Sequence, residues 1–418
     1  MTSGGVISGT PTTSGTSSFT VQVTDSQTPA DTATKALSIT ITSGGGTSAT
    51  YQFASSDGES STTSTSYTNK TTMTFTPNSS DDWIIFAFAE FKESSTSYRA
   101  GVQFAIDAAV AQDSDVAPKD TTDYQSFMGM KVVTLPAASH TFSIDYKTSN
   151  AGGTAYIRNA RIVAVRKVAL ELYSNDGGDT GSDLTTTETD YASVSFTPPS
   201  TSDYLFIYSA EWNAATTSYN TVIEGGFYNG TQYYFDTTTV TSSDANNWYT
   251  FVGQKTANCS AGVQVTATVK AYKQSGSSAV HHIKHARAAA FNLNTGRFSN
   301  FQMQRDDNET TTSSTSWQQK ITKSISVSTA QDWLVLCTFR LGNSSTSYSS
   351  ESQVQLDNTT TMANPMRRPQ ATTDYFQCGC FDVRNLGVGT RVFDHDYRTS
   401  NSSGTAKCTK SHFIALPL

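Results

Sequence analysis

Asp82-Trp83-Ile84-Ile85-Phe86 is the first of three copies of the pattern that decides the fold of this chain. The other copies are Asp203-Tyr204-Leu205-Phe206-Ile207 and Asp332-Trp333-Leu334-Val335-Leu336. Each is followed by a Ser/Thr-rich stretch, and these stretches end at Tyr98, Tyr219 and Tyr348. The repeat is about 120 residues long, which is the size of a whole domain rather than of a solenoid unit. Three tandem domains favour a structural or binding protein over an enzyme.

Further anchors recur in the same order in each copy. Tyr67, Tyr191 and Trp317 precede the pattern, and the residues that follow it are Asp123-Tyr124 before Gly129, Asn247-Trp248 before Gly253, and Asp374-Tyr375 before Gly379. Near the end of the copies, Tyr146, Tyr272 and Tyr397 each precede a basic residue, which predicts one shared strand-end position packed on the core. Short runs rich in Val, Ile, Phe and Tyr alternate with turn residues, as in a sandwich or jelly roll of seven or eight strands.

We therefore predict an all-β protein with three tandem jelly-roll or β-sandwich domains, at residues 49–167, 168–295 and 296–418. Almost no spacer separates the copies, and only Asn294-Thr295-Gly296 stands between the second and the third. Flexible beads would need longer linkers, so we expect domains that pack together or keep a fixed orientation. Two arrangements fit: a pseudo-threefold cluster, in which one chain imitates a homotrimer of jelly rolls, or a rigid rod.

Composition narrows the classes of partner. Charged residues are 15% of the chain, below the ~25% usual for soluble domains, and the formal net charge is −7. An acidic chain lacks the basic face that nucleic acids require, so we expect no nucleic-acid partner. The sequence has no apolar stretch of ~18 residues, which predicts no membrane span. Met1-Thr2-Ser3-Gly4-Gly5 lacks the basic start and the apolar core of a signal peptide.

The first 43 residues form a different module. Phe19–Asp25 and Ala36–Ile41 alternate apolar and polar residues, which predicts two strands of a half-buried sheet. Together with the Gly5–Thr16 run, this segment resembles an immunoglobulin-like family of bacterial surface and phage virion proteins. The resemblance implies a partial immunoglobulin-like sandwich at residues 1–43, followed by a Gly-rich linker at 44–48. Its missing strands would be supplied by a longer product or by a neighbouring subunit.

Acidic residues gather at one place in every copy. A Gly-containing loop with carboxylates is a candidate for Ca²⁺, which takes 6–8 oxygen ligands. A solvated turn is the favoured alternative, because the calcium-loop spacing is missing. The candidate ligands are Asp57, Glu59, Asp176, Asp179, Asp306 and Asp307. We expect no other cofactor.

Histidine and cysteine groups offer further candidates. His281, His282 and His285 lie on one predicted strand, where a surface patch is favoured over a metal site. Four of the five cysteines, Cys337, Cys378, Cys380 and Cys408, fall in the third copy, with Cys259 in the second. Buried thiols, a disulfide and zinc all fit, and we favour buried thiols. Nucleophile-elbow, zinc-protease and phosphate-loop motifs are all missing, so we predict no catalytic residues.

The repeats resemble modules of phage virion and appendage proteins, through the order T-S-Y, D-W, S-T-S-Y and the closing run Gly153–Arg161. That resemblance implies a virion structural protein at the virion surface, in decoration, fibre or attachment, with protein subunits as partners and a homo-oligomer as the expected state. The alternative is a cell-surface or secreted adhesin fragment, in which aromatic residues stack on glycans; the candidates are Trp212, Tyr228, Tyr233 and Tyr234. A third alternative, an enzyme accessory module, would need a catalytic domain upstream.

Overall fold

A computed structural model describes residues 15–41, 50–167, 171–178, 181–230, 232–242, 244–294, 298 and 300–418. In these residues every element from β1 to β30 is a β-strand, which confirms the predicted all-β class. No helix in the described part of the chain is long and apolar enough to cross a membrane.

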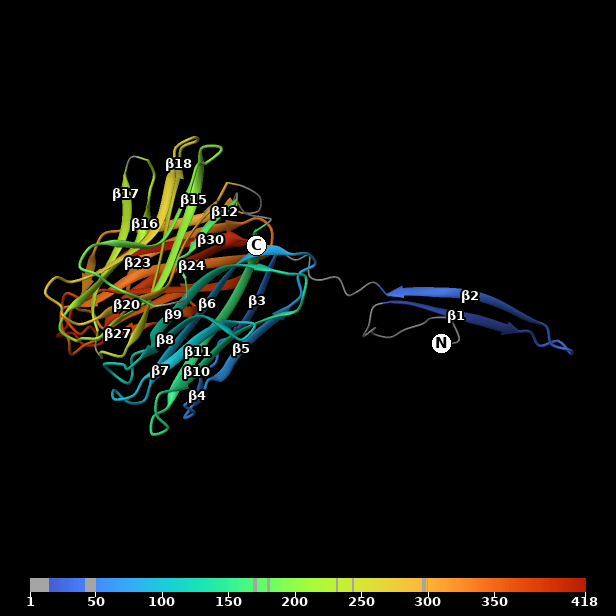
Figure 1. The fold of residues 1–418 in the computed structure, drawn as a ribbon, viewed down its shortest axis with the longest axis horizontal. Helices are drawn as coiled ribbons and strands as arrows, with labels where there is room; N and C mark the ends of the chain where they lie inside the picture. The colour runs from blue at the N-terminus through green and yellow to red at the C-terminus, as the bar shows by residue number, and fades with distance from the viewer. Residues whose placement is uncertain are drawn as a thin grey trace.

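The N-terminal module is a two-stranded hairpin, β1 (Gly15–Thr24) and β2 (Thr32–Ile41), paired in an unbroken antiparallel register. It pairs with no other described strand and lies apart from the main body in Figure 1. The other parts of the predicted immunoglobulin-like module and the Gly-rich linker at 44–48 lie outside the described residues.

The main body consists of three lobes of sequential strands, which Figure 1 shows in successive colours. Lobe 1 contains β3 (Tyr51–Ser56), β4 (Ser60–Thr62), β5 (Thr68–Phe75), β6 (Asp81–Glu93), β7 (Ala100–Ile106), β8 (Ala109–Val116), β9 (Gln125–Leu135), β10 (His140–Thr148) and β11 (Ala155–Arg166). Lobe 2 contains β12 (Leu172–Asp176), β13 (Ser182–Asp183), β14 (Thr189–Phe196), β15 (Ser202–Ala214), β16 (Asn220–Tyr228), β17 (Tyr233–Thr241), β18 (Trp248–Cys259), β19 (Val265–Lys273) and β20 (His281–Asn292). Lobe 3 contains β21 (Gln302–Asp306), β22 (Thr310–Thr312), β23 (Gln318–Val327), β24 (Gln331–Asn343), β25 (Ser350–Leu356), β26 (Thr360–Ala363), β27 (Met366–Arg367), β28 (Phe376–Leu386), β29 (Gly389–Thr399) and β30 (Ala406–Pro417).

The strand order identifies each lobe as a jelly roll. When the eight main strands of a lobe are lettered B to I along the chain, one sheet has the order B-I-D-G and the other C-H-E-F. Lobe 1 has β3-β11-β6-β9 and β5-β10-β7-β8, lobe 2 has β12-β20-β15-β18 and β14-β19-β16-β17, and lobe 3 has β21-β30-β24-β28 and β23-β29-β25-β26. A single pair, Trp248 with Asp115, joins β18 of lobe 2 to β8 of lobe 1 and makes these two sheets continuous. This is the double-sheet arrangement of the jelly roll.

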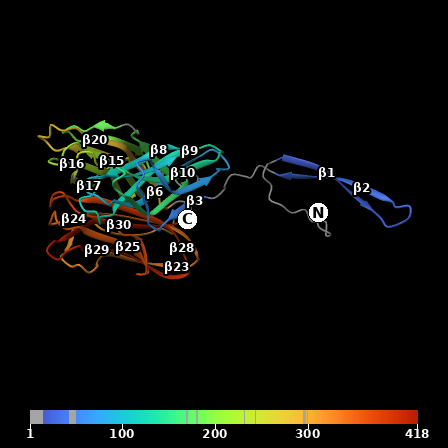
Figure 2. The ribbon, with the colours of Figure 1, turned by 90° about the horizontal axis from the view of Figure 1, so that it is seen from below.

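The three lobes surround a common axis formed by their G strands. β9, β18 and β28 contact one another pairwise, and Figure 2 shows lobe 3 in orange and red packed against the other two. Met128, Val252 and Gly379 meet on this axis: a Cβ built on Gly379 would lie 2.5 Å from Val252 Cγ1 and 2.8 Å from Met128 Sδ. The pseudo-threefold cluster, rather than the rod, is therefore the arrangement of the lobes.

Ladder register corrects one of the sequence anchors. Across the D–G ladders, Ala87 pairs with Gly129, Tyr208 with Gly253, and Cys337 with Cys380. Cys380 is thus the equivalent of the two glycines, and Gly379 lies one position earlier, at the axis.

The D strands are apolar along nearly their whole length because their sheets are covered on both faces. In β6, Trp83 and Ile85 point into the core of lobe 1, whereas Ile84, Phe86 and Phe88 belong to the cluster centred on lobe 3. Burial on both faces removes the need for alternating polar residues. The unbroken apolar run therefore builds a lobe and also joins it to its neighbours.

Candidate functional site: the junctions between the lobes

Each junction is built at a bulge between strands D and I. The D–I ladder shifts register in all three lobes, and Asn159, His285 and Lys410 adopt positive φ values of 52°, 50° and 53° there. A bulge redirects side chains at the place where it occurs. Here it brings charged residues of one lobe against strand F, or the segment just after it, in the next lobe.

The first set of equivalent contacts runs in one direction around the axis. Glu90 of lobe 1 accepts the backbone N–H of Asn364 in lobe 3 at 2.5 Å, and Glu211 of lobe 2 accepts the backbone N–H of Asp113 in lobe 1 at 2.5 Å. Arg340 of lobe 3 completes the series by donating to the carbonyl of Thr237 in lobe 2. Lobe 1 thus contacts lobe 3, lobe 3 contacts lobe 2, and lobe 2 contacts lobe 1, which closes a ring.

A second set, on strand I, repeats the same circuit with an arginine or histidine in each lobe. Arg161 donates to the carbonyl of Met362 at 2.6 Å, and Arg287 donates to the carbonyl of Ala111 at 2.8 Å. In lobe 3 the equivalent residue is His412, whose Nδ1 lies 2.6 Å from the carbonyl oxygen of Gln254. A buried arginine or histidine side chain therefore reaches the backbone of the neighbouring lobe at every junction.

Arg161 is the most deeply buried of these three side chains, with 1% of its surface exposed. Its guanidinium lies 2.9 Å from Asp57 of its own lobe and 3.3 Å from Asp382 of lobe 3. Burial raises the pKa of Asp382, and Arg161 opposes that rise. A buried ion of this kind is tolerated only when its charge and its hydrogen bonds are matched, as they are here.

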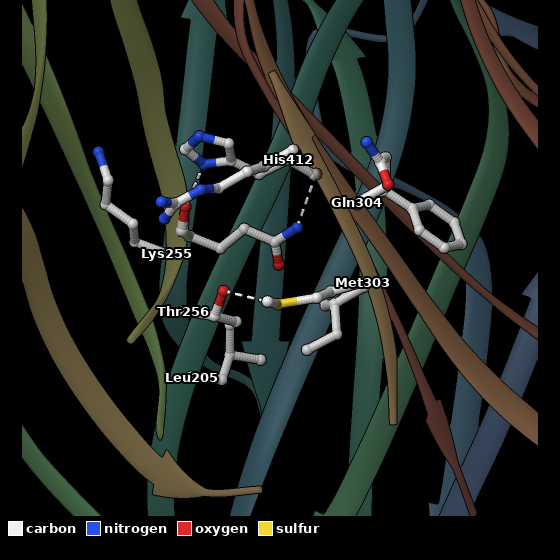
Figure 3. A pocket seen from close by; sticks show the side chains of 10 residues that line it. Leu205, Lys255, Thr256, Met303, Gln304 and His412 are labelled. Carbon is white, nitrogen blue, oxygen red and sulfur yellow. Dashed lines mark hydrogen bonds between the residues drawn. The ribbon is translucent and has the colours of Figure 1, made fainter. Parts of the chain in front are cut away.

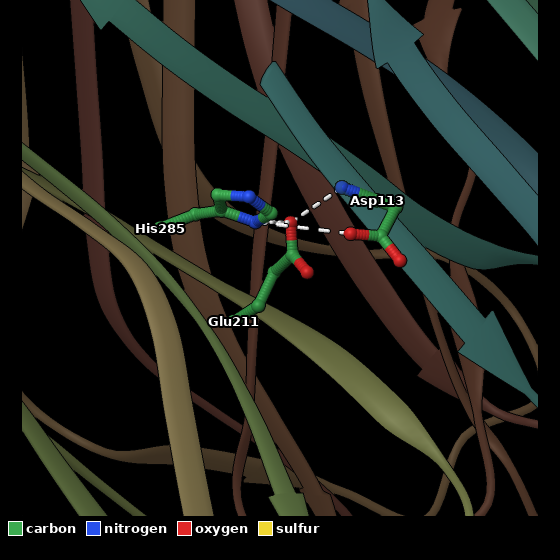
Figure 4. A group of neighbouring side chains, drawn as sticks. All are labelled: Asp113, Glu211 and His285. Atoms are coloured by element: carbon green, nitrogen blue, oxygen red, sulfur yellow. Dashed lines mark hydrogen bonds and ion pairs between the residues drawn. The ribbon is translucent and has the colours of Figure 1, made fainter. Parts of the chain in front are cut away.

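The junction of lobes 1 and 2 brings together Asp113, Glu211 and His285, whose potential ligand atoms lie within 4.8 Å of one another (Figure 4). His285 Nδ1 lies 2.9 Å from Glu211 Oε1. The ammonium of Lys284 lies 2.6 Å from Asp113 and 3.2 Å from Glu211. Burial raises the pKa of Glu211, and His285 opposes the rise. The ammonium of Lys284 pairs with both carboxylates, so the cluster forms an ion-pair network across the junction.

The junction of lobes 2 and 3 carries a second such cluster, of Asp236, Asp307 and His412. His412 Nε2 lies 2.5 Å from Asp307, and this hydrogen bond holds the pKa of Asp307 well below its usual range. Lys255 pairs with Asp236 at 3.1 Å. Figure 3 shows His412 and Lys255 beside a small pocket with Leu205, Thr256 and Met303, where the two lobes meet. Lys255 and His412 each lie against one of the two carboxylates, so this cluster is a second polar network across a junction.

A third set of contacts comes from the loops before the G strands. Asp123 accepts a hydrogen bond from Ser349 Oγ at 2.6 Å, and Asn247 accepts the backbone N–H of Ala117 at 2.8 Å. Asp374 accepts both the N–H and the hydroxyl of Thr241, each at 3.0 Å. Burial raises the pKa of Asp123 to about 6. These side chains again join lobe 1 to lobe 3, lobe 3 to lobe 2 and lobe 2 to lobe 1.

The described calcium candidates, one group in each lobe, all lie against other groups of the protein. The described candidates are held by groups of the protein: Asp57 by Arg161, Asp176 by Arg287, Asp306 by Lys320, Asp307 by His412, and Glu59 by the Tyr124 hydroxyl. Asp179 lies outside the described residues. Three of them, Asp57, Asp176 and Asp307, belong to the junctions, which the sequence did not indicate.

The histidine prediction is wrong for two of its three residues. His281 and His285 are buried, and only His282 keeps partial exposure, so they form no surface patch. His281 bonds the hydroxyls of Thr221 and Ser277. The ring of His281 loses solvation on burial, which lowers its pKa to about 4.

The aromatic candidates separate into two groups. Trp212 is 2% exposed and stacks on Tyr249 at 4.7 Å, so the prediction of an exposed ring is wrong there. Tyr228, Tyr233 and Tyr234 lie together at the end of the β16–β17 hairpin, and Tyr233 is 62% exposed. All five cysteines are buried free thiols, as favoured.

No protein-family model matches the chain, and no characterised protein matches it in sequence. Among solved structures, it is similar to a chain of Sulfolobus turreted icosahedral virus at 12% identity and a TM-score of 0.20, over 96% of this chain and 90% of that one. The match to a structure described as a triple jelly roll with turret assembly in an archaeal virus has 10% identity and a TM-score of 0.18, over 96% and 90%. A third match, to infectious bursal disease virus, has 7% identity and a TM-score of 0.22, over 81% and 66%.

All three are proteins of virus structures. At these scores the likeness carries no argument, and the jelly-roll assignment rests on the strand order described above.

Proposed function

We propose that the chain is a non-enzymatic structural protein of a virion, a rigid three-lobed subunit of capsid decoration, a fibre or another appendage. The observation that carries the proposal is the closed ring of three jelly rolls. Jelly rolls are a recurrent fold of viral shells. Because a buried side chain of each lobe bonds to the backbone of its neighbour at every junction, we infer that the ring is one rigid block rather than three mobile modules.

Chemical considerations agree with a structural role. In the two His-carboxylate clusters of the described residues, Lys284 pairs with Asp113 and Glu211, and Lys255 pairs with Asp236, as expected of ion-pair networks that join lobes. The sheets of the lobes instead offer broad faces for contact with other subunits. A chain with three similar lobes fits a threefold position of a shell, where it takes the place of a homotrimer.

We further propose that the β1–β2 hairpin attaches the block to another virion subunit. Phe19, Val21 and Val23 share one face of the hairpin with Leu37, since Phe19 pairs with Leu37 in the ladder. Val23 is 62% exposed and Leu37 is 41% exposed. A two-stranded hairpin is marginally stable alone, and a third strand or a packed apolar face stabilises it.

The test is mass spectrometry of density-gradient-purified particles from the source, with peptide coverage mapped along this chain. We expect recovery in fixed stoichiometry with the other particle proteins. In a particle-assembly assay, a variant lacking residues 1–49 should keep the spectroscopic and melting behaviour of the three-lobed body but fail to join particles. Recovery only from culture fluid or cell envelopes would contradict the virion role and would support the adhesin alternative.

A further inference from the structure

The outer face of the C-H-E-F sheet of lobe 2 carries a row of residues that take no part in the described contacts between lobes. Ser195, Thr266, Tyr228 and Tyr233 are consecutive cross-strand partners on β14, β19, β16 and β17. Three inter-strand spacings of about 4.8 Å make this row roughly 14 Å long. We call these four residues the tyrosine row. It crosses the whole sheet and ends at the solvent-exposed ring of Tyr233.

The two rings of the row lie against each other, with centroids 4.5 Å apart and an angle of 31° between their planes. The hydroxyl of Tyr228 donates to the carbonyl of Gly230, which fixes that ring in its orientation. At the other end of the row, the hydroxyls of Ser195 and Thr266 lie 2.7 Å apart. An exposed aromatic platform therefore continues into a pair of hydroxyl groups on one flat surface.

The fold does not require tyrosines at this position. Tyr228 and Tyr233 form the last pair of the E–F hairpin in lobe 2. The corresponding last pairs are Ile106 with Ala109 in lobe 1 and Leu356 with Thr360 in lobe 3, and both hairpins close without aromatic rings. Tyr233 keeps 62% of its surface exposed, so its ring stabilises the core little.

Carboxylates flank the row on the same face. Lys270 pairs with Glu188 at 2.6 Å and lies 4.0 Å from Asp190, and Glu224 accepts a hydrogen bond from Thr237. Glu224 and Asp190 are the cross-strand partners of Lys270. The ammonium of Lys270 also lies 5.8 Å from the centroid of the Tyr233 ring. Three acidic groups around this one lysine leave a net negative charge on this side of the row, which disfavours anionic ligands.

We propose that the tyrosine row binds a neutral oligosaccharide. The C–H face of a pyranose ring is apolar and packs on an exposed aromatic ring, while its hydroxyls exchange hydrogen bonds with Ser, Thr and carboxylate side chains. Tyr233 supplies the stacking surface, Tyr228 supports it, and Thr266 with Ser195 contacts the next sugar. This activity goes beyond the structural role and stands or falls independently of particle incorporation.

The test uses the full chain on an array of neutral, amino and anionic glycans, followed by calorimetric titration of the best neutral oligosaccharide. We expect binding to neutral glycans, a loss of about tenfold or more in affinity with Tyr233→Ala, and retention with Tyr233→Phe. Val110→Ala, at the exposed end of the equivalent lobe 1 hairpin, is the matched control and should bind as the parent does. Unchanged melting of all variants would separate binding from folding. No binding anywhere on the array, binding to anionic glycans alone, or affinity unaffected by Tyr233→Ala would each overturn the proposal.

Discussion

Replacing Gly379 by alanine tests the pseudo-threefold axis directly, because a single added methyl group falls where the three lobes meet. The new Cβ would lie 2.5 Å from Val252 Cγ1 of lobe 2 and 2.8 Å from Met128 Sδ of lobe 1. Ordinary carbon–carbon contacts begin near 3.5 Å, so both neighbours must move by the better part of an ångström.

The cost of that movement differs between the two neighbours. Met128 has flexible torsions and adapts readily, whereas Val252 is β-branched and stiff at χ1. Overpacking a filled core by a methyl group costs roughly 1–3 kcal/mol. We expect Gly379→Ala to lie in the upper half of that range, since the backbone of β28 is itself held by the Ser126 hydroxyl, 2.6 Å from the Gly379 carbonyl.

The assay is urea-induced unfolding of the full chain, with Gly58→Ala as the control. Gly58 has no neighbour within 4 Å of a built Cβ, so its alanine variant should unfold within ~0.5 kcal/mol of the parent. Val252→Ala removes the obstructing methyl groups and should rescue Gly379→Ala, with a coupling of at least ~1 kcal/mol in the double-mutant cycle. A Gly379→Ala variant as stable as Gly58→Ala, or strict additivity with Val252→Ala, would refute the axis.

Three further predictions concern buried ionisable side chains. Asp123 has a pKa of about 6 in the folded protein and ~3.9 in the unfolded chain, so protonated Asp123 stabilises the fold below pH ~3.9 and this stabilisation is lost as pH rises through about 6. We expect the unfolding free energy of the parent to fall by up to about 3 kcal/mol over this pH range, and we expect Asp123→Asn to lack that fall. His395 gives the opposite pH dependence of stability: burial lowers its pKa to about 3, so the neutral ring stabilises the fold above pH ~6.5 and this stabilisation is lost as pH falls toward 3. NMR should therefore find the His395 ring neutral at pH 5. Arg161→Ala removes one of the two guanidinium partners of the buried Asp382 carboxylate and should cost roughly 3–5 kcal/mol in urea unfolding. Arg384→Ala, which removes a 29%-exposed partner of the same carboxylate, should cost less, and equal losses would contradict the argument.

Much of the fold could be predicted from the sequence because the signals were local. Trp83 and Trp333 mark the start of equivalent D strands, and the apolar runs after them give the strands themselves. The choice between a ring and a rod depended on what covers the second face of those strands. Ile84 and Phe86 stand on that face, and an unbroken apolar run is the sign of a strand buried on both sides.

The strand register, and with it the face on which each side chain lies, could not be predicted as well. Tyr146 and Tyr397 are buried in the cores of their lobes as predicted, but Tyr272 is only half-buried. Ladder pairing shows why: Ala271 pairs with Ile223 on the core side, which places Tyr272 on the opposite face. A shift of one residue reverses the direction of a strand side chain, and no local sequence pattern fixes it.

The sequence showed that the junction residues share one position in the three copies, but it did not show what they contact. Glu90, Glu211 and Arg340 occupy one position, but the groups they bond across the junction are backbone groups of another lobe. Backbone groups leave no signature in a sequence, and the direction of the ring is not encoded in any one repeat. The functional meaning of that position therefore required the structure.

The chemical differences between the junctions explain what one chain gains over a homotrimer. Three identical subunits would present the same pair at every junction, whereas here Glu90 and Glu211 accept a backbone N–H and Arg340 donates to a carbonyl. Exchanging lobes would place a carboxylate against a carbonyl, or a guanidinium against an N–H, inside a buried interface. Such mismatches are costly, so each lobe fits one neighbour and the order of the ring is fixed. Once the order is fixed, the outer faces are free to differ, and lobe 2 alone carries the stacked pair of Tyr228 and Tyr233 at its hairpin end.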